Sequence, residues 1–162
     1  MFHVIKPVIV GFTIDAMRKG KDKDIISIIL ADDHKVVRHA IKVSLETEAE
    51  FRVIGEAGDG LEAVKQTKNL QPDILVVDIS MPGPNGIEVT RQVRKCSPKT
   101  KVVILSMHSA EVYVRQALEA GAMGYVLKES VPEHLINAIR EALAGRNYVS
   151  PPFSKRLLKN TG

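Results

Sequence analysis

Five short apolar runs, rich in β-branched residues, alternate with five amphipathic stretches, and this alternation restricts the fold more than any other feature of the sequence. The apolar runs lie at residues 25–31, 51–57, 73–79, 101–106 and 124–127. Apolar residues return every three or four positions, as they do in helices, at residues 36–48, 60–70, 86–96, 110–121 and 132–145. Five strand–helix units predict an α/β fold with a parallel sheet, because a helical crossover returns each strand alongside an earlier one.

Several predicted strands are apolar along nearly their whole length, as residues 74–77 are, and do not alternate with polar residues. Such strands are typical of sheets that helices cover on both faces. With 162 residues, 44% of them hydrophobic, the chain has room for one domain with its own core. We predict this domain at residues 25–145, with a flexible extension at residues 1–24 and a linker or tail at residues 146–162.

The net charge of +4 does not indicate a nucleic-acid-binding surface. Residues 1–24 carry five Lys or Arg and three Asp, and residues 146–162 carry four Lys or Arg and no acid. The remaining 14 basic and 16 acidic residues leave the predicted domain slightly negative. The single cysteine, Cys96, cannot form an internal disulfide, and Lys6 and Pro7 interrupt the N-terminal apolar patch. We therefore expect a cytoplasmic protein that has no membrane anchor.

Polar side chains stand where the predicted strands end. Asp32 and Asp33 follow the first strand, and Asp78 closes the third. Ser106 closes the fourth strand, and Lys128 follows the fifth. The carboxyl ends of parallel strands lie along one edge of a sheet, which is where ligands bind in such folds. We therefore expect these side chains to meet at one edge.

Each of these residues, taken singly, also has a structural explanation, since Asp and Ser often cap helices and Lys is usually solvated. That explanation is weakest for Asp78, because an unpaired carboxylate buried by an apolar strand is costly. Crowded carboxylates repel one another unless a cation holds them, and hard oxygen ligands with room for water suit Mg²⁺. With Ser106 and Lys128 as partners for an anion, the set suggests phosphoryl transfer onto Asp78 by in-line attack of its oxygen.

Four motifs in a fixed order carry a family resemblance. They are ADDH (31–34), VVDISMPGPNG (76–86), ILSMHS (104–109) and GYVLK (124–128). On these motifs the predicted domain resembles the response-regulator receiver domain of two-component signalling. The sequence around the motifs resembles the NarL/FixJ (LuxR-type) subgroup in particular. The resemblance implies a flavodoxin-like (βα)5 three-layer sandwich with strand order 2-1-3-4-5. It also implies that Asp78 accepts a phosphoryl group from the phosphohistidine of a sensor histidine kinase.

The resemblance implies a metal site as well. Carried over residue by residue, Asp33 and Asp78 would ligate Mg²⁺ together with the backbone carbonyl of Ser80, and Asp32 would act through a water molecule. Mn²⁺ would serve as a substitute.

The remaining family positions concern the phosphoryl group. Ser106 would bind it, and Lys128 would pair with it. Tyr125 matches the switch aromatic, which turns inward when the hydroxyl residue moves toward the phosphate; its alternative is a partly buried side chain at a sheet edge. Ser80 and His108 occupy positions that tune the lifetime of the phosphoryl group in the family. The alternative for His108 is a loop side chain that faces solvent and does not affect this lifetime.

The sequence departs from the family pattern at two positions. Asn85 stands where the loop often carries Asp, which should change the turn little because Asn serves similar turns. Lys128 is followed by Glu129, whereas many relatives have proline at this position. A cis-proline bond is therefore not expected at that joint.

Members of the subgroup usually continue into a DNA-binding helix-turn-helix domain, whereas 17 residues follow Gly145 here, too few for such a core. We expect DNA binding only through an output domain absent from this chain. The alternative is a stand-alone receiver that acts through protein–protein contacts, and homodimerisation on phosphorylation is left open. Two other classes of protein fit less well. An Asp-nucleophile phosphatase would need a carboxylate two residues after Asp78, where this chain has Ser80. A flavin-binding protein would need a hydroxyl- and glycine-rich loop after the first strand, where this chain has DDHK.

Overall fold

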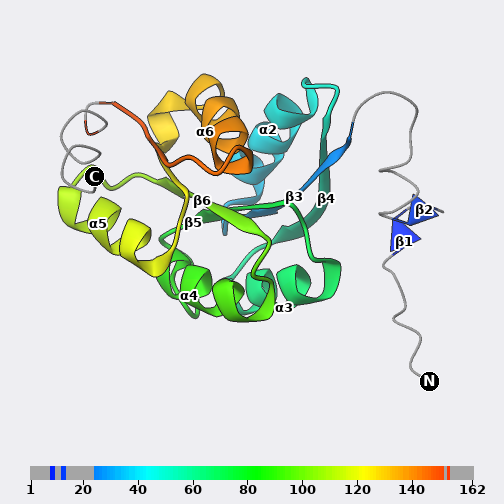
Figure 1. Cartoon of the computed structure of the whole chain (residues 1–162), viewed down its shortest axis with the longest axis horizontal. Coiled ribbons are helices and arrows are strands. Elements are labelled where there is room, and N and C mark those ends of the chain that lie inside the picture. The colour runs from blue at the N-terminus through cyan, green and yellow to red at the C-terminus, as the bar shows by residue number, and fades with distance from the viewer. Residues whose placement is uncertain (1–7, 10–11, 14–23, 152, 154–162) are drawn as a thin grey trace.

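The computed structural model describes residues 8–9, 12–13, 24–151 and 153. From residue 26 onward, five strands alternate with five helices, and this part of the chain also contains a short 3₁₀ helix and a further strand (Figure 1). The elements are β3 (Ile26–Ala31), α2 (Lys35–Glu46), β4 (Phe51–Ala57), α3 (Gly60–Leu70), β5 (Ile74–Asp78), α4 (Gly86–Cys96), β6 (Lys101–Ser106), α5 (Glu111–Ala120), β7 (Gly124–Leu127), η1 (Lys128–Ser130), α6 (Glu133–Leu143) and β8 (Tyr148–Val149). The bounds differ from the predicted ones by at most two residues.

Most of the expected flexible extension at residues 1–24 lies outside the described residues. Within it, β1 (Val8–Ile9) and β2 (Phe12–Thr13) form an antiparallel pair. In the part of the chain that the structure describes, no helix has the length and apolar character needed to cross a membrane.

The main sheet is parallel throughout and has the order β4-β3-β5-β6-β7-β8. Its first five strands confirm the predicted order 2-1-3-4-5 when they are numbered along the chain. The reversal of order lies between β3 and β5, so the loops that follow these two strands lie next to each other at the carboxyl edge.

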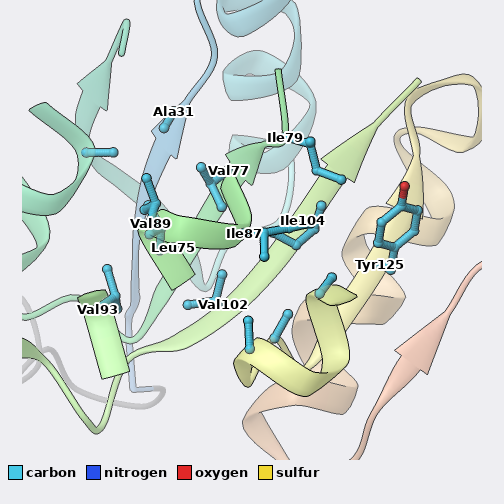
Figure 2. Packing of buried hydrophobic residues seen from close by; sticks show 14 of the residues in the cluster. Ala31, Leu75, Val77, Ile79, Ile87, Val89, Val93, Val102, Ile104 and Tyr125 are labelled. Atoms are coloured by element: carbon cyan, nitrogen blue, oxygen red, sulfur yellow. The ribbon is translucent and has the colours of Figure 1, made fainter. Parts of the chain in front are cut away.

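Helices cover both faces of the sheet, which confirms the three-layer sandwich. Figure 1 shows α2 and α6 on one face and α3, α4 and α5 on the other. Neighbouring residues of β5 enter different cores. Ile74 and Val76 pack with the residues of α2 and α6. Leu75 and Val77 pack with those of α3, α4 and α5 (Figure 2). All four are fully buried, which explains why the strand shows no polar alternation.

The sheet has a sixth strand that sequence analysis does not predict, in the segment assigned to the linker or tail. In β8, Tyr148 pairs with Gly124 and Val149 with Tyr125. Val149 and the following Ser150 are buried. Ser150 holds the strand in place, since its backbone N–H donates to the Tyr125 carbonyl (3.0 Å) and its hydroxyl accepts from the Leu127 N–H (3.1 Å). As a result, β7 is an inner strand.

Local contacts fix the loops at the carboxyl edge. The side-chain oxygen of Asn85 accepts hydrogen bonds from the N–H groups of Ile87 (3.0 Å) and Glu88 (2.9 Å), so Asn85 caps α4. A β-carbon on Gly86 would lie 2.5 Å from the carbonyl oxygen of Asp78, so only glycine allows α4 to start this close to β5. Among the described residues, the cis peptide bond joins Val131 to Pro132, three residues beyond the Lys128 joint.

Candidate functional site

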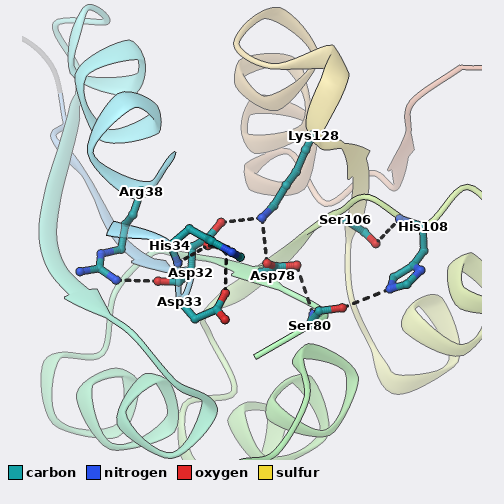
Figure 3. A network of polar contacts seen from close by, with 9 residues as sticks. All are labelled: Asp32, Asp33, His34, Arg38, Asp78, Ser80, Ser106, His108 and Lys128. Atoms are coloured by element: carbon teal, nitrogen blue, oxygen red, sulfur yellow. Dashed lines mark hydrogen bonds and ion pairs between the residues drawn. The ribbon is translucent and has the colours of Figure 1, made fainter. Parts of the chain in front are cut away.

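The structure brings the strand-end residues together at the carboxyl edge of the sheet (Figure 3). Asp32 directly follows β3, Asp78 is the last residue of β5, and Ser106 is the last residue of β6. Lys128 directly follows β7 and begins η1. The predicted convergence is therefore confirmed for residues as far apart as 96 positions in the sequence.

Lys128 joins the carboxylates of two different loops. Its Nζ lies 2.7 Å from Oδ2 of Asp32 and 2.8 Å from Oδ2 of Asp78. Asp32 is fully buried and Asp78 is 4% exposed, so both charges depend on partners inside the protein. Burial lowers the pKa of Lys128, but the hydrogen bonds that its ammonium donates to Asp32 and Asp78 outweigh burial and raise this pKa above its ordinary value. Lys128 is therefore a fixed cation at this edge.

Four side chains form an acidic cluster at the same place. One potential ligand atom from each of Asp32, Asp33, His34 and Asp78 lies within 4.8 Å of the others. Together with Lys128, the three carboxylates leave an excess of two negative charges. Closely spaced carboxylate oxygens are the donors that Mg²⁺ and Mn²⁺ favour, so the donor set fits a divalent cation.

Backbone contacts orient the two buried carboxylates. Oδ1 of Asp78 accepts a hydrogen bond from the N–H of Ser80 (3.2 Å), and Oδ1 of Asp32 accepts one from the N–H of His34 (2.9 Å). Each carboxylate thus binds Lys128 through one oxygen and its own loop through the other. Arg38 holds the first loop from behind, because its Nη1 donates to the Asp32 carbonyl oxygen (2.5 Å).

On the other side of Asp78, His108 connects three elements. Its N–H donates to the Ser106 hydroxyl (2.8 Å), and its carbonyl accepts from the Tyr125 hydroxyl (2.7 Å). Its ring nitrogen Nε2 lies 3.1 Å from the Ser80 hydroxyl, so a hydrogen bond links the loop after β6 to the loop after β5. The ring of His108 therefore has a hydrogen-bond partner, whereas the alternative prediction was a side chain that only faces solvent.

Tyr125 points into the protein. Its side chain is fully buried, not partly buried at a sheet edge, because β8 covers β7 on the outer side. Burial raises the pKa of Tyr125 above its ordinary value of 10.0. Its ring packs within the core, and its hydroxyl reaches the loop that carries His108.

Sequence reasoning did not assign three residues of this region. His34 contributes to the acidic cluster, and its place directly after Asp33 was the available signal. Arg38 lies one turn into α2, and nothing local indicates that it reaches back to the Asp32 carbonyl. Tyr113 stacks on the ring of His108, with ring centroids 4.4 Å apart, and no sequence motif points to it.

Comparisons with known proteins agree with the four motifs. Residues 28–140 match the family model of the response regulator receiver domain. The chain is 37% identical over 143 residues to the transcriptional regulatory protein DegU of Brevibacillus brevis, a match that covers 88% of this chain and 61% of DegU. It is 37% identical over 142 residues to the oxygen regulatory protein NreC of Staphylococcus carnosus, covering 85% of this chain and 65% of NreC. The chain thus spans less than two thirds of these relatives.

Solved structures support both the fold and the predicted subgroup. A LuxR-family two-component response regulator from Aurantimonas sp. SI85-9A1 has a TM-score of 0.79 and 37% identity, and the match covers 85% of this chain and 99% of that one. The signal receiver domain of NarL from Mycobacterium tuberculosis has a TM-score of 0.73 and 32% identity, with coverage of 76% and 100%.

Proposed function

The chain belongs to the response-regulator receiver family, and on that premise we propose that Asp78 accepts a phosphoryl group from a phosphohistidine of a sensor histidine kinase in a Mg²⁺-dependent reaction. In this transfer the P–N bond of the phosphohistidine breaks as a carboxylate oxygen of Asp78 forms a P–O bond. Receivers of this family are signalling domains and not conventional enzymes. The phosphatase alternative is disfavoured further, because the position that would need a carboxylate is Ser80, whose hydroxyl binds His108.

One observation carries the proposal: Lys128 places its ammonium group against the buried carboxylates of Asp32 and Asp78 at an open edge of the sheet. A cation held there can pair with a phosphoryl oxygen as negative charge arrives. The carboxylate of Asp78 is oriented by the Ser80 N–H, so its geometry is set before the partner binds.

Asp33, Asp78 and the carbonyl oxygen of Ser80 would hold Mg²⁺ or Mn²⁺, with Asp32 acting through a water molecule, and the bound cation would neutralise part of the phosphoryl charge. The clustering of the carboxylate oxygens supports this assignment.

Ser106 and Tyr125 form the proposed switch. Ser106 would bind a phosphoryl oxygen, and its hydroxyl already accepts the N–H of His108, whose carbonyl binds Tyr125. A change at Ser106 therefore reaches Tyr125 through one residue. The hydrogen bonds of the His108 N–H to Ser106 and of the Tyr125 hydroxyl to the His108 carbonyl support this route of coupling.

Ser80 and His108 are proposed to set the lifetime of the phosphoryl group, because their hydrogen bond lies beside Asp78 (Figure 3). The decay rate of phosphorylated His108→Ala tests this assignment. We expect it to differ from the wild-type rate, and an unchanged rate would remove the assignment.

For the biological output we propose control of transcription through a DNA-binding domain outside this chain, with residues 25–145 and the strand β8 as the receiver, the residues after β8 as the linker and the cytoplasm as the location. The support is that relatives named as transcriptional regulators are longer than the matched region. A stand-alone receiver that acts through protein–protein contacts is the second candidate. Homodimerisation on phosphorylation belongs to either proposal.

Labelling with acetyl phosphate or beryllofluoride tests the central proposal. Wild-type protein should be modified only when Mg²⁺ or Mn²⁺ is present, and Asp78→Asn should not be modified. Asp59→Asn is the matched control, because Asp59 caps α3 through its side chain and Asn caps helices equally well. Equal labelling of Asp78→Asn and wild type would exclude Asp78 as the acceptor.

A further inference from the structure

Tyr113 supports the ring of His108 from the side of α5. It lies in the first turn of that helix, and its side chain packs against the core between the sheet and α3, α4 and α5. The rings of Tyr113 and His108 are 4.4 Å apart between centroids and inclined by 26°, which is a stacked arrangement. A residue anchored in the core thus fixes the plane of a ring in a loop.

The ring of His108 needs such support because its backbone and its side chain are held by different partners. Ser106 and Tyr125 bind the backbone of His108, which leaves rotation about the side-chain bonds free. The stack on Tyr113 and the hydrogen bond between Nε2 and the Ser80 hydroxyl restrict that rotation. If the stack is lost, a single hydrogen bond must hold the ring across the gap between two loops.

The bridge between His108 and Ser80 lies next to the proposed phosphoacceptor. The N–H of Ser80 donates to Oδ1 of Asp78, and the hydroxyl of the same residue meets the ring of His108. Figure 3 shows His108 and Ser80 together on one flank of Asp78, opposite Lys128. A water molecule that approaches a phosphoryl group on Asp78 from this flank meets the bridge.

We propose that Tyr113 is a positioning residue for the phosphoryl lifetime: by stacking on His108 it keeps the bridge to Ser80 closed and slows hydrolysis of the aspartyl phosphate. The inference rests on the proposed function of Asp78. In the hydrolysis, water adds to phosphorus and the P–O bond to Asp78 breaks. The Asp78 carboxylate is regenerated, inorganic phosphate leaves, and one proton passes to the solvent. Tyr113 touches none of the reacting atoms and acts only through His108.

The test is the first-order decay of protein labelled with acetyl phosphate after removal of the excess reagent. Loss of one aromatic stack predicts that Tyr113→Ala decays about two- to tenfold faster than wild type. Tyr113→Phe keeps the ring and should decay at the wild-type rate. Val112→Ala changes the exposed neighbouring position of the same helix and should also leave the rate unchanged.

A double-mutant cycle separates positioning from a general structural role. If Tyr113 acts through His108, Tyr113→Ala should have no further effect in a His108→Ala background. Independent, multiplying effects of the two substitutions would overturn the inference, as would a wild-type decay rate for Tyr113→Ala. Tyr113→Leu retains apolar contact with the core but loses the stack. It gives the same test if the alanine variant does not fold.

The outcomes also distinguish this inference from the proposed function. If wild type is not labelled, or if Asp78→Asn is labelled equally, the acceptor assignment fails and the inference falls with it. If Asp78 is labelled and the decay rate does not depend on the Tyr113 ring, the positioning role alone fails.

Discussion

Nζ of Lys128 lies 2.8 Å from Oδ2 of Asp78, although 50 positions separate the two residues in the sequence. Replacing Lys128 by Met leaves the buried carboxylates of Asp32 and Asp78 without their cation. We expect the free energy of unfolding without divalent metal to fall by about 1–3 kcal/mol, less than a deeply buried pair loses, because solvent reaches this edge. Urea unfolding measures the change. Lys65→Met, which alters an exposed lysine of α3, should have little effect, and equal stability of the two variants would contradict the prediction.

Asp33→Asn should change stability in opposite directions with and without metal. Asp33 is the most exposed carboxylate of the cluster, and Lys128 binds the other two. Removing its charge relieves repulsion, so the metal-free protein should gain about 0.5–1 kcal/mol. The same substitution removes a proposed ligand, so the rise in melting temperature on adding Mg²⁺ should shrink. Thermal unfolding at several Mg²⁺ concentrations measures both effects, and an unchanged Mg²⁺ response would argue against Asp33 as a ligand.

Stability should decline at alkaline pH, and Tyr125 should account for part of the decline. Burial raises the pKa of Tyr125, so the unfolded chain loses this proton near pH 10 while the folded protein retains it. The folded state therefore loses stability as the pH rises above about 10, and the raised pKa of Lys128 acts in the same direction at slightly higher pH.

Tyr125→Phe removes this tyrosine from the titration. At neutral pH it should cost about 1 kcal/mol, because the carbonyl of His108 loses its hydrogen-bond donor. Between about pH 9 and pH 11, the unfolding free energy of the variant should fall less steeply than that of wild type. Urea unfolding across this range compares the slopes. Parallel curves would show that Tyr125 does not contribute to the decline.

Gly86→Ala should distort the end of β5. Its β-carbon would lie 2.5 Å from the Asp78 carbonyl oxygen, so α4 must move away from the residue that carries the proposed acceptor. We expect a loss of about 1–3 kcal/mol in the free energy of unfolding together with weaker labelling of Asp78. Gly58→Ala is the control at the same edge, because its nearest neighbour, Nη1 of Arg38, would lie 3.6 Å away. Similar behaviour of both variants would show that close packing at Gly86 does not matter.

Much of this fold is predictable because its strands and helices carry strong periodic signals. The bounds of α3, α4, β6 and β7 match the predicted ranges residue for residue. The strand-end rule for parallel sheets then places Asp32, Asp78 and Lys128 together without any knowledge of side-chain contacts.

What sequence reasoning missed depends on tertiary contacts. The strand β8 has two residues, too few for any period to appear, and it forms because Ser150 can bind the backbone of β7. The stack of Tyr113 on His108 depends on the conformation of the loop after β6, which no local pattern specifies. The reach of Arg38 to the Asp32 carbonyl likewise needs the folded geometry of α2.

The attachment of β8 has a mechanical consequence. Ser150 is fastened to β7 at two points, the carbonyl of Tyr125 and the N–H of Leu127, one residue before Lys128. Force applied to the chain beyond β8 is therefore transmitted directly to β7, which carries Tyr125 and is followed at once by Lys128. A tether pulled from that side should disturb this strand before it unravels any helix.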